Sequence, residues 1–125
     1  MSVPVLVVED DGLIRMDLAD TLADRGYDVL EAANADEAMS VLETSRIDAL
    51  LTDIDMPGSL NGIALAAWVA ERWPSCRIIV ISGRYSPSQG SLPEEARFLS
   101  KPISESALFQ TLAELDIPSP DGEFT

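Results

Sequence analysis

The chain has 125 residues, 46% of them hydrophobic, which fits a single globular domain. Its 22 acidic and 8 basic residues give a net charge of −14, and so acidic a surface disfavours direct contact with nucleic acid. The absence of histidine excludes histidine acid–base catalysis, Ser-His-Asp triads and ordinary zinc sites. Any chemistry must therefore use carboxylates, hydroxyls and a few cations.

The cellular compartment follows from what the sequence lacks. The stretch MSVPVLVV has no basic region or cleavage site of a signal peptide, and no apolar run approaches the ~20 residues that span a bilayer. The single cysteine, Cys76, excludes an internal disulfide framework. We therefore expect a cytoplasmic protein that makes no membrane contact.

Short apolar runs alternate with amphipathic helical patterns along the chain. The runs are rich in β-branched residues, which is typical of strands buried on both faces of a parallel sheet. Polar residues such as Asp11, Asn34 and Asn61 stand where helix N-caps are expected. In chain order, the predicted elements are strand 3–8, helix 12–25, strand 27–32, helix 35–45, strand 48–52, helix 62–73, strands 77–82 and 97–100, and helix 104–115.

The segment between the last two strands breaks this alternation. It contains Pro87, Gly90 and Pro93, where a helix would be expected. An interior glycine costs a helix about 1 kcal/mol and an interior proline about 3 kcal/mol relative to alanine. We therefore predict at most one helical turn within residues 84–95.

Alternation of strands and helices predicts right-handed βαβ units and a parallel sheet with helices on both faces. Five such strands most often form a flavodoxin-like (βα)5 doubly wound sheet of order 2-1-3-4-5, here with the fourth helix shortened or absent. Residues 1–117 would form this domain and residues 118–125 a short disordered tail. Ligands bind such sheets at the carboxyl ends of the strands, so the residues that follow each strand are the candidates for a site.

Those residues are acids, a hydroxyl and an ammonium. Several carboxylates close together repel one another unless a cation is present, and hard oxygen ligands suit Mg²⁺. The alternative is that they are helix caps and solvated surface, which we favour for Asp11 alone but not for the set. In chain order they are Glu9, Asp10 and Asp11, then Asp53 and Asp55, then Ser82 with Gly83, and finally Lys101 with Pro102.

Four motifs at these strand ends, VLVVEDD, LLTDIDMPG, VISG and FLSKP, resemble the signatures of the receiver (CheY-like) domain of bacterial two-component response regulators. The resemblance covers roughly residues 3–116, and the set in this order is far more specific than any one motif. It implies a response regulator that takes a phosphoryl group from a phosphohistidine of a sensor histidine kinase or a histidine phosphotransfer protein. Phosphorylation would then change its contacts with a downstream protein, which no feature of the sequence names.

The resemblance also implies a role for each matched residue. Asp53 would be the phospho-acceptor. Glu9 and Asp10 would hold Mg²⁺ (or Mn²⁺) together with Asp53 and the backbone carbonyl of Asp55. Lys101 would pair with one phosphoryl oxygen. The domain would catalyse its own phosphotransfer and dephosphorylation without being a classical enzyme.

Further positions would adjust this chemistry. Ser82 would hydrogen-bond to a phosphoryl oxygen, and Gly83 would leave open space beside it. A cis peptide bond before Pro102 would direct the preceding ammonium inward. Phe98 matches the aromatic switch position, which is more often tyrosine or histidine, although a plain core role is an equal alternative. Arg84 would form an ion pair with the acid two residues past the acceptor and restrict water, or both side chains would simply be solvated.

Two other interpretations compete with this one. A phosphatase of the haloacid dehalogenase type also uses an aspartyl phosphate, but it carries its D-x-D motif on the first strand, whereas here D-x-D follows the third. A degenerate receiver that is never phosphorylated usually lacks the acceptor, the acid pair or the lysine, and this chain has all three. If the chain is the entire protein, we expect a stand-alone regulator that acts through protein–protein contacts.

Overall fold

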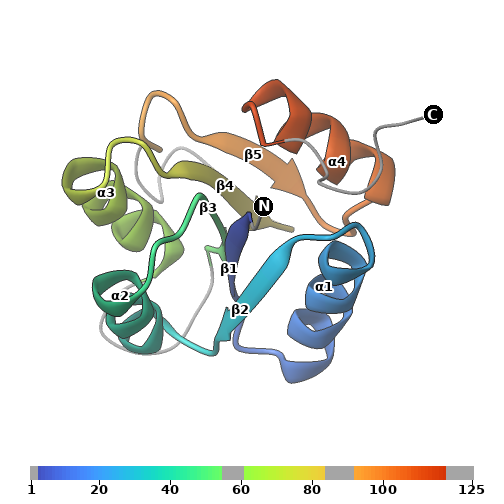
Figure 1. Cartoon of the computed structure of the whole chain (residues 1–125), viewed down its shortest axis with the longest axis horizontal. Coiled ribbons are helices and arrows are strands. Elements are labelled where there is room, and N and C mark those ends of the chain that lie inside the picture. Colours follow the sequence, from blue (N-terminus) through green and yellow to red (C-terminus); the bar gives the residue numbers. More distant parts are fainter. Residues whose placement is uncertain (1–2, 55–60, 84–91, 118–125) are drawn as a thin grey trace.

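Five parallel strands form a single sheet (Figure 1). The computed structural model describes residues 3–54, 61–83 and 92–117. The strands are β1 (Pro4–Val8), β2 (Asp28–Ala32), β3 (Ala49–Asp53), β4 (Arg77–Ser82) and β5 (Arg97–Ser100), and the helices described are α1 (Gly12–Asp24), α2 (Ala35–Thr44), α3 (Gly62–Arg72) and α4 (Glu105–Glu114). The strand order β2-β1-β3-β4-β5 confirms the flavodoxin-like prediction.

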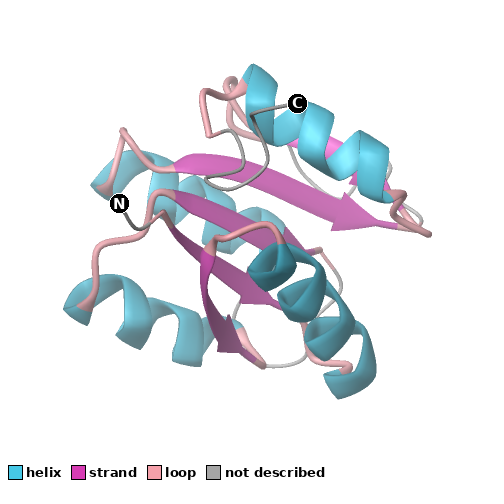
Figure 2. Cartoon of the chain, turned by 45° about the vertical axis from the view of Figure 1, so that its right-hand side comes forward, coloured by secondary structure: helices cyan, strands magenta, loops and turns pink. Residues whose placement is uncertain are grey.

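Helices cover both faces of the sheet, α1 and α4 on one side and α2 and α3 on the other (Figure 2). Alternate residues of a strand point to opposite faces. Val5 and Val7 of β1 accordingly pack in the core under α1 and α4, and Leu6 and Val8 pack under α2 and α3. Every residue of β1 and β3 is buried, which explains the apolar runs of these strands in the sequence, although β3 ends in the buried polar residues Thr52 and Asp53. Among the described residues, no helix is long and apolar enough to cross a membrane.

Side-chain caps set the starts of the helices, as predicted. Asp11 accepts hydrogen bonds from the first backbone N–H groups of α1, and Asn34 and Asn61 do the same for α2 and α3. The helix predicted at 104–115 begins one residue later, because Ser104 is its cap and accepts from the N–H of Ala107. Such caps satisfy backbone donors that have no partner inside the helix.

The irregular segment before β5 is described only in part. Residues 92–96 contain no helix, and the N–H of Ala96 donates to the carbonyl of Pro93 in a turn. Leu92 and Ala96 pack against the core under α2 and α3. Residues 84–91 and the predicted tail at 118–125 lie outside the described residues, so both expectations remain predictions.

The carboxyl end of α3 holds both tryptophans of the chain. The rings of Trp68 and Trp73 meet edge to face with centroids 5.1 Å apart. The guanidinium of Arg72 lies 5.1 Å and 5.0 Å from the two ring centroids, which permits cation–π attraction to both. Gly62 begins the same helix, so Trp68 lies six residues and Trp73 eleven residues from the start of α3.

Candidate functional site

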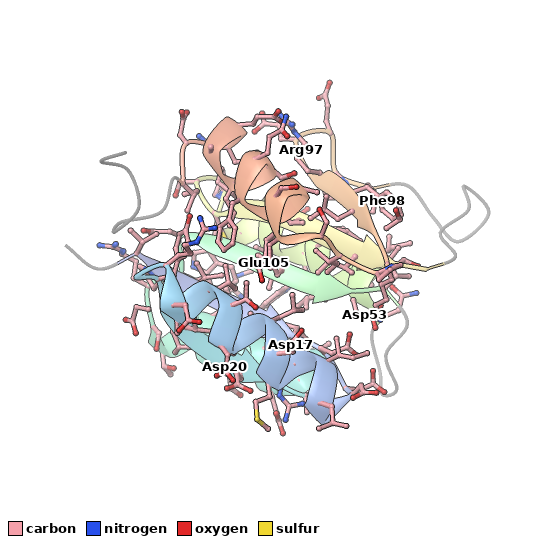
Figure 3. All side chains as sticks on the ribbon, turned by 90° about the vertical axis from the view of Figure 1, so that its right-hand side faces the viewer. Asp17, Asp20, Asp53, Arg97, Phe98 and Glu105 are labelled. Atoms are coloured by element: carbon pink, nitrogen blue, oxygen red, sulfur yellow. The ribbon has the colours of Figure 1, made fainter. Side chains whose placement is uncertain are left out.

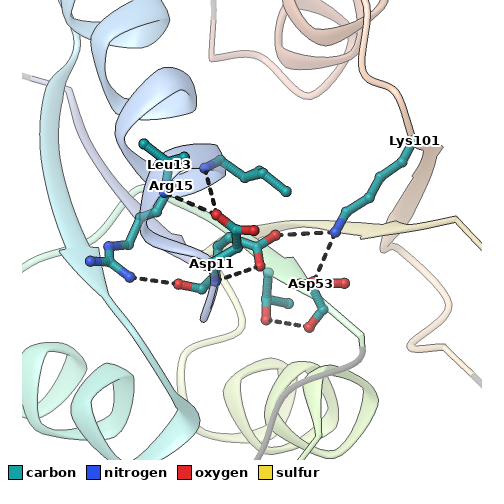
Figure 4. A network of polar contacts seen from close by, with 8 residues as sticks. Asp11, Leu13, Arg15, Asp53 and Lys101 are labelled. Carbon is teal, nitrogen blue, oxygen red and sulfur yellow. Dashed lines mark hydrogen bonds and ion pairs between the residues drawn. The ribbon is translucent and has the colours of Figure 1, made fainter.

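Side chains that follow β1 and β5 meet the last side chain of β3 at the carboxyl edge of the sheet (Figures 3 and 4). The Lys101 Nζ lies 3.0 Å from Asp53 Oδ2 and 3.2 Å from Glu9 Oε1. The Asp53 and Glu9 side chains are only 6% and 4% exposed. Two nearly buried carboxylates therefore share one ammonium group, and among the described residues of the cluster negative charge is in excess.

Asp53 is held by the strand that carries it. The predicted strand ended at Thr52, but the ladder continues to Asp53, which pairs with Ile81 of β4. The hydroxyl of Thr52 donates to the Asp53 carbonyl at 3.0 Å, and the N–H of Ile54 donates to the Ile81 carbonyl. The carboxylate thus stands on rigid sheet backbone rather than on a loop.

Asp10 completes a cluster of three carboxylates. One oxygen each from Glu9, Asp10 and Asp53 lies within 4.8 Å of the others, with Asp10 exposed and the other two buried. Burial, and then the negative charge of Asp53, raises the pKa of Glu9 to about 7. Hard oxygen donors with unbalanced negative charge are the ligand set that a divalent cation such as Mg²⁺ prefers, so these residues fit the ion.

The ammonium of Lys101 responds to the same cluster. Burial by itself lowers the pKa of Lys101, but the hydrogen bonds and charges of Asp53 and Glu9 outweigh that effect and raise it. The group is therefore a permanent cation at neutral pH, fixed between two acids. The peptide bond between Lys101 and Pro102 is cis, as the resemblance implies.

Of the other predicted site residues, some lie in the described part of the chain and some do not. Ser82 ends β4 and is fully buried, and its carbonyl accepts from the N–H of Lys101 at 3.0 Å. Within the described part of the chain, a Cβ added to Gly83 would have its nearest contact at 3.9 Å, with the Lys101 Cβ, and the role of Gly83 remains a prediction. Phe98 is 39% exposed, which contradicts the plain core alternative. Asp55 and Arg84 lie outside the described residues, and so does their predicted ion pair.

Two residues of the site were missed in the sequence. Gly62, the first residue of α3, packs so closely on Asp53 that an added Cβ would lie 1.9 Å from the Asp53 carbonyl oxygen. Arg15 of α1 donates to the Glu9 carbonyl at 2.8 Å. The glycine at the end of PGSLNG is visible in the sequence, but its contact depends on how α3 meets β3. No pattern in the sequence indicates the contact of Arg15 with the Glu9 carbonyl.

A groove of about 490 Å³ opens beside the acid cluster. Ile14 and Leu18 of α1 line one side, and Pro102 and Ile103 line the other. Leu13 next to it is 80% exposed. The site is therefore bordered by apolar surface on the side of α1.

Comparisons with known proteins agree with this geometry. The family model of the response regulator receiver domain matches residues 5–113. The transcriptional regulatory protein PdtaR of Mycobacterium tuberculosis is 36% identical over 115 residues, which are 86% of this chain and 54% of PdtaR. The sensor kinase CckA of Brucella abortus is 34% identical over 119 residues, which are 91% of this chain and 12% of CckA. The chain thus spans about half of one of these relatives and a small part of the other.

Solved structures give the same result. The chemotaxis protein CheY4 of Vibrio cholerae superposes with a TM-score of 0.82 at 28% identity, covering 92% of this chain and 99% of CheY4. The receiver domain of the hybrid histidine kinase CckA superposes with a TM-score of 0.77 at 32% identity, covering 90% of this chain and 97% of that domain. This family consists of phospho-acceptors of two-component signalling rather than classical enzymes, which argues against the phosphatase alternative. The chain belongs to the receiver domain family of response regulators.

Proposed function

We propose that Asp53 accepts the phosphoryl group and that Glu9, Asp10 and Asp53 hold a divalent cation, Mg²⁺ or Mn²⁺, while it does so. The observation that carries the proposal is the placement of the Asp53 carboxylate, buried at the end of β3, with the Lys101 ammonium 3.0 Å away. Two further carboxylates lie within 4.8 Å of it. A nucleophile, a fixed cation and a cation site in one place are the parts that phosphoryl transfer needs.

The transfer itself is an exchange of bonds at phosphorus. A carboxylate oxygen of Asp53 bonds to phosphorus while the bond from phosphorus to the imidazole nitrogen of the donor breaks, and that nitrogen keeps the electron pair. The Lys101 ammonium stabilises negative charge on a phosphoryl oxygen, since it is already positioned beside Asp53. When bound, Mg²⁺ supplies further positive charge to the phosphoryl oxygens.

The residues of β4 and β5 would carry the response outward. The Ser82 hydroxyl would donate to a phosphoryl oxygen, because it lies at the end of the strand that neighbours β3. Phe98 stands on β5 with a partly exposed ring and would change its exposure on phosphorylation. The Asp55 carbonyl and Arg84 keep their expected roles as metal ligand and water barrier, on residues outside the described part of the chain.

The donor would be a phosphohistidine on a sensor histidine kinase or a histidine phosphotransfer protein. The groove between α1 and the segment after β5 is lined by Asp17, Lys101 and four apolar side chains, a mixture that suits docking of a protein surface beside the acceptor. The output would be a change in contacts with another protein. The net charge of −14 disfavours direct contact of this domain with nucleic acid.

Phosphorylation by acetyl phosphate in the presence of Mg²⁺ tests the proposal. Intact mass or a Phos-tag gel should show one added phosphoryl group on the wild type and none on Asp53→Asn. Asp48→Asn is the matched control, because Asp48 lies before β3 at the opposite edge of the sheet and should not affect labelling. Excess EDTA should abolish labelling of the wild type.

Three results would overturn parts of the proposal. Labelling that persists in Asp53→Asn would place the acceptor elsewhere. Labelling that survives EDTA would contradict the metal role. A folded wild type that no phosphodonor labels would favour a receiver-like binding module that functions without phosphorylation.

A further inference from the structure

Arg15 of α1 contacts both the turn after β1 and the strand β2 near the acid cluster, and Figure 4 shows the first of these contacts. Its Nη1 donates to the carbonyl oxygen of Glu9 at 2.8 Å, and its Nε donates to Glu31 Oε1 of β2 at 3.1 Å. The Arg15 side chain is 24% exposed, while that of Glu31 is 45% exposed. One guanidinium thus donates two hydrogen bonds, one to the backbone that bears the acid pair and one to a side chain of the neighbouring strand.

The carbonyl that Arg15 contacts belongs to the peptide between Glu9 and Asp10. That short turn from β1 into α1 is also held at its other polar groups: the Glu9 N–H donates to the Ala32 carbonyl at 3.1 Å, and the Asp11 N–H donates to Glu9 Oε2 at 3.0 Å. Rotation of the peptide would move both acidic side chains together. The Arg15 contact therefore opposes the motion that would separate the two acids from Asp53.

We propose that Arg15 is a positioning residue for the divalent-cation site, and that Glu31 orients its guanidinium for this task. The inference rests on the proposed function, since it concerns the same cation site. Arg15 acts through the backbone of the acid pair and is not itself a ligand, because a guanidinium carries only donors and a permanent positive charge. Groups that orient metal ligands in this way commonly change metal affinity about tenfold or more when they are removed.

For the same substitution, the loss of charge and the loss of positioning predict opposite changes in the Kd for Mg²⁺. Arg15→Met removes a positive charge near three carboxylates, so through-space electrostatics alone would tighten Mg²⁺ binding. Loss of positioning would weaken it instead. The sign of the change in Kd therefore separates the two effects.

The experiment is a calorimetric titration of the metal-free protein with Mg²⁺, above the pKa of Glu9, with Mn²⁺ binding by electron paramagnetic resonance as a second readout. Arg15→Met should raise the Kd for Mg²⁺ about tenfold. Phosphorylation at saturating Mg²⁺ should return close to the wild-type rate, because the ion then restores the arrangement of the acids. Arg15→Lys should be intermediate, because an ammonium lacks the rigid fork of donors.

Arg46→Met is the matched control. It removes the same charge and a similar side chain at the opposite edge of the sheet, where Arg46 pairs with Asp48. Its Kd for Mg²⁺ should equal that of the wild type. Thermal unfolding of each variant shows whether the titrated protein is folded.

Glu31→Gln tests the second part of the proposal and remains available if Arg15→Met does not fold. It should weaken Mg²⁺ binding less than Arg15→Met does. In the double variant Glu31→Gln should add nothing further, because Glu31 acts through Arg15, whereas independent charge effects would add.

An unchanged or tighter Kd in Arg15→Met would overturn the inference and leave the proposed function intact. Additive effects in the double variant would overturn the role of Glu31. A wild type that binds neither Mg²⁺ nor Mn²⁺ would overturn the inference and the metal part of the proposed function together.

Discussion

The two edges of the sheet both carry charged side chains, but they arrange them differently. At the amino edge, Arg46 pairs with Asp48 at 3.0 Å, and these side chains are 70% and 30% exposed. At the carboxyl edge, the single Lys101 ammonium faces the nearly buried carboxylates of Glu9 and Asp53. In the part of the chain that the structure describes, one edge thus has balanced, exposed pairs, and the other has buried carboxylates in excess of its cations.

The difference shows how to recognise a working site in a fold of this kind. Exposed ion pairs contribute little to stability, about 0–1 kcal/mol each, and leave no charge uncompensated. Buried charge in excess is costly, and proteins retain it mainly where it does chemistry. Even the cavity of about 470 Å³ at the amino edge, which includes Cys76, fits this view, since burial raises the pKa of that thiol to about 12 and makes it unreactive.

A larger side chain in place of Gly62, at the carboxyl edge, should cause the largest loss of stability. Gly62→Ala places a Cβ 1.9 Å from the Asp53 carbonyl oxygen, so α3 or β3 must shift. We expect a loss of about 3 kcal/mol in the free energy of unfolding and slower phosphorylation. Denaturant unfolding and labelling by acetyl phosphate measure the two effects.

Gly12→Ala is the control for that substitution. Gly12 also begins a helix, but a Cβ there would have its nearest contact at 3.8 Å, with Arg15 Nη2. This variant should stay within about 0.5 kcal/mol of the wild type. Equal stability of the two variants would mean that the close packing on Asp53 is not what makes Gly62 necessary.

Titration of Glu9 should cause the next largest change in the free energy of unfolding. The raised pKa of about 7, against an ordinary value of 4.5, means that the folded metal-free protein binds this proton more tightly than the unfolded chain does. The stability that Glu9 contributes is therefore complete below about pH 4.5 and is lost as the pH rises through about 7. The loss should be about 3 kcal/mol.

Comparison with Glu9→Gln isolates this contribution from that of the other acids. The difference in unfolding free energy between the wild type and Glu9→Gln should shift against the wild type over that pH range, and Mg²⁺ should reduce the shift. Glu43→Gln, which removes a carboxylate from an exposed pair with Arg72, is the control for loss of a carboxylate outside the site. A parallel pair of pH curves for wild type and Glu9→Gln would contradict the raised pKa.

Removal of one cation from each edge compares the two edges directly. Lys101→Met takes away the ammonium that both buried carboxylates contact, so we expect a loss of about 2 kcal/mol near neutral pH, after allowance for partial solvent access. Arg46→Met should cost less than about 0.5 kcal/mol. Chemical denaturation without divalent cations measures both, and similar losses would erase the distinction between the two edges.

The convergence of Glu9, Asp53 and Lys101 could be predicted because parallel strands bring their carboxyl ends to one edge. The order of the strands and the helix caps could also be predicted, because each depends on patterns among a few neighbouring residues. The contacts of Gly62 and Arg15 could not be predicted, since they depend on how closely a helix approaches a strand and on the reach of a long side chain across the sheet. The extension of β3 to Asp53 likewise depends on its pairing with β4, which a single segment does not reveal.

The tryptophan pair at the end of α3 gives the protein an intrinsic optical probe. All of its tryptophan fluorescence arises from Trp68 and Trp73, of which the first lies in α3 and the second caps it, and α3 begins at the residue packed on the Asp53 carbonyl. Trp68 follows Gly62 by six residues, about 9 Å along the helix axis, and Trp73 follows the last residue of α3, so neither ring lies at the end of the helix that packs on Asp53. A change in emission on phosphorylation would therefore report movement of the whole helix, in real time and without an attached dye.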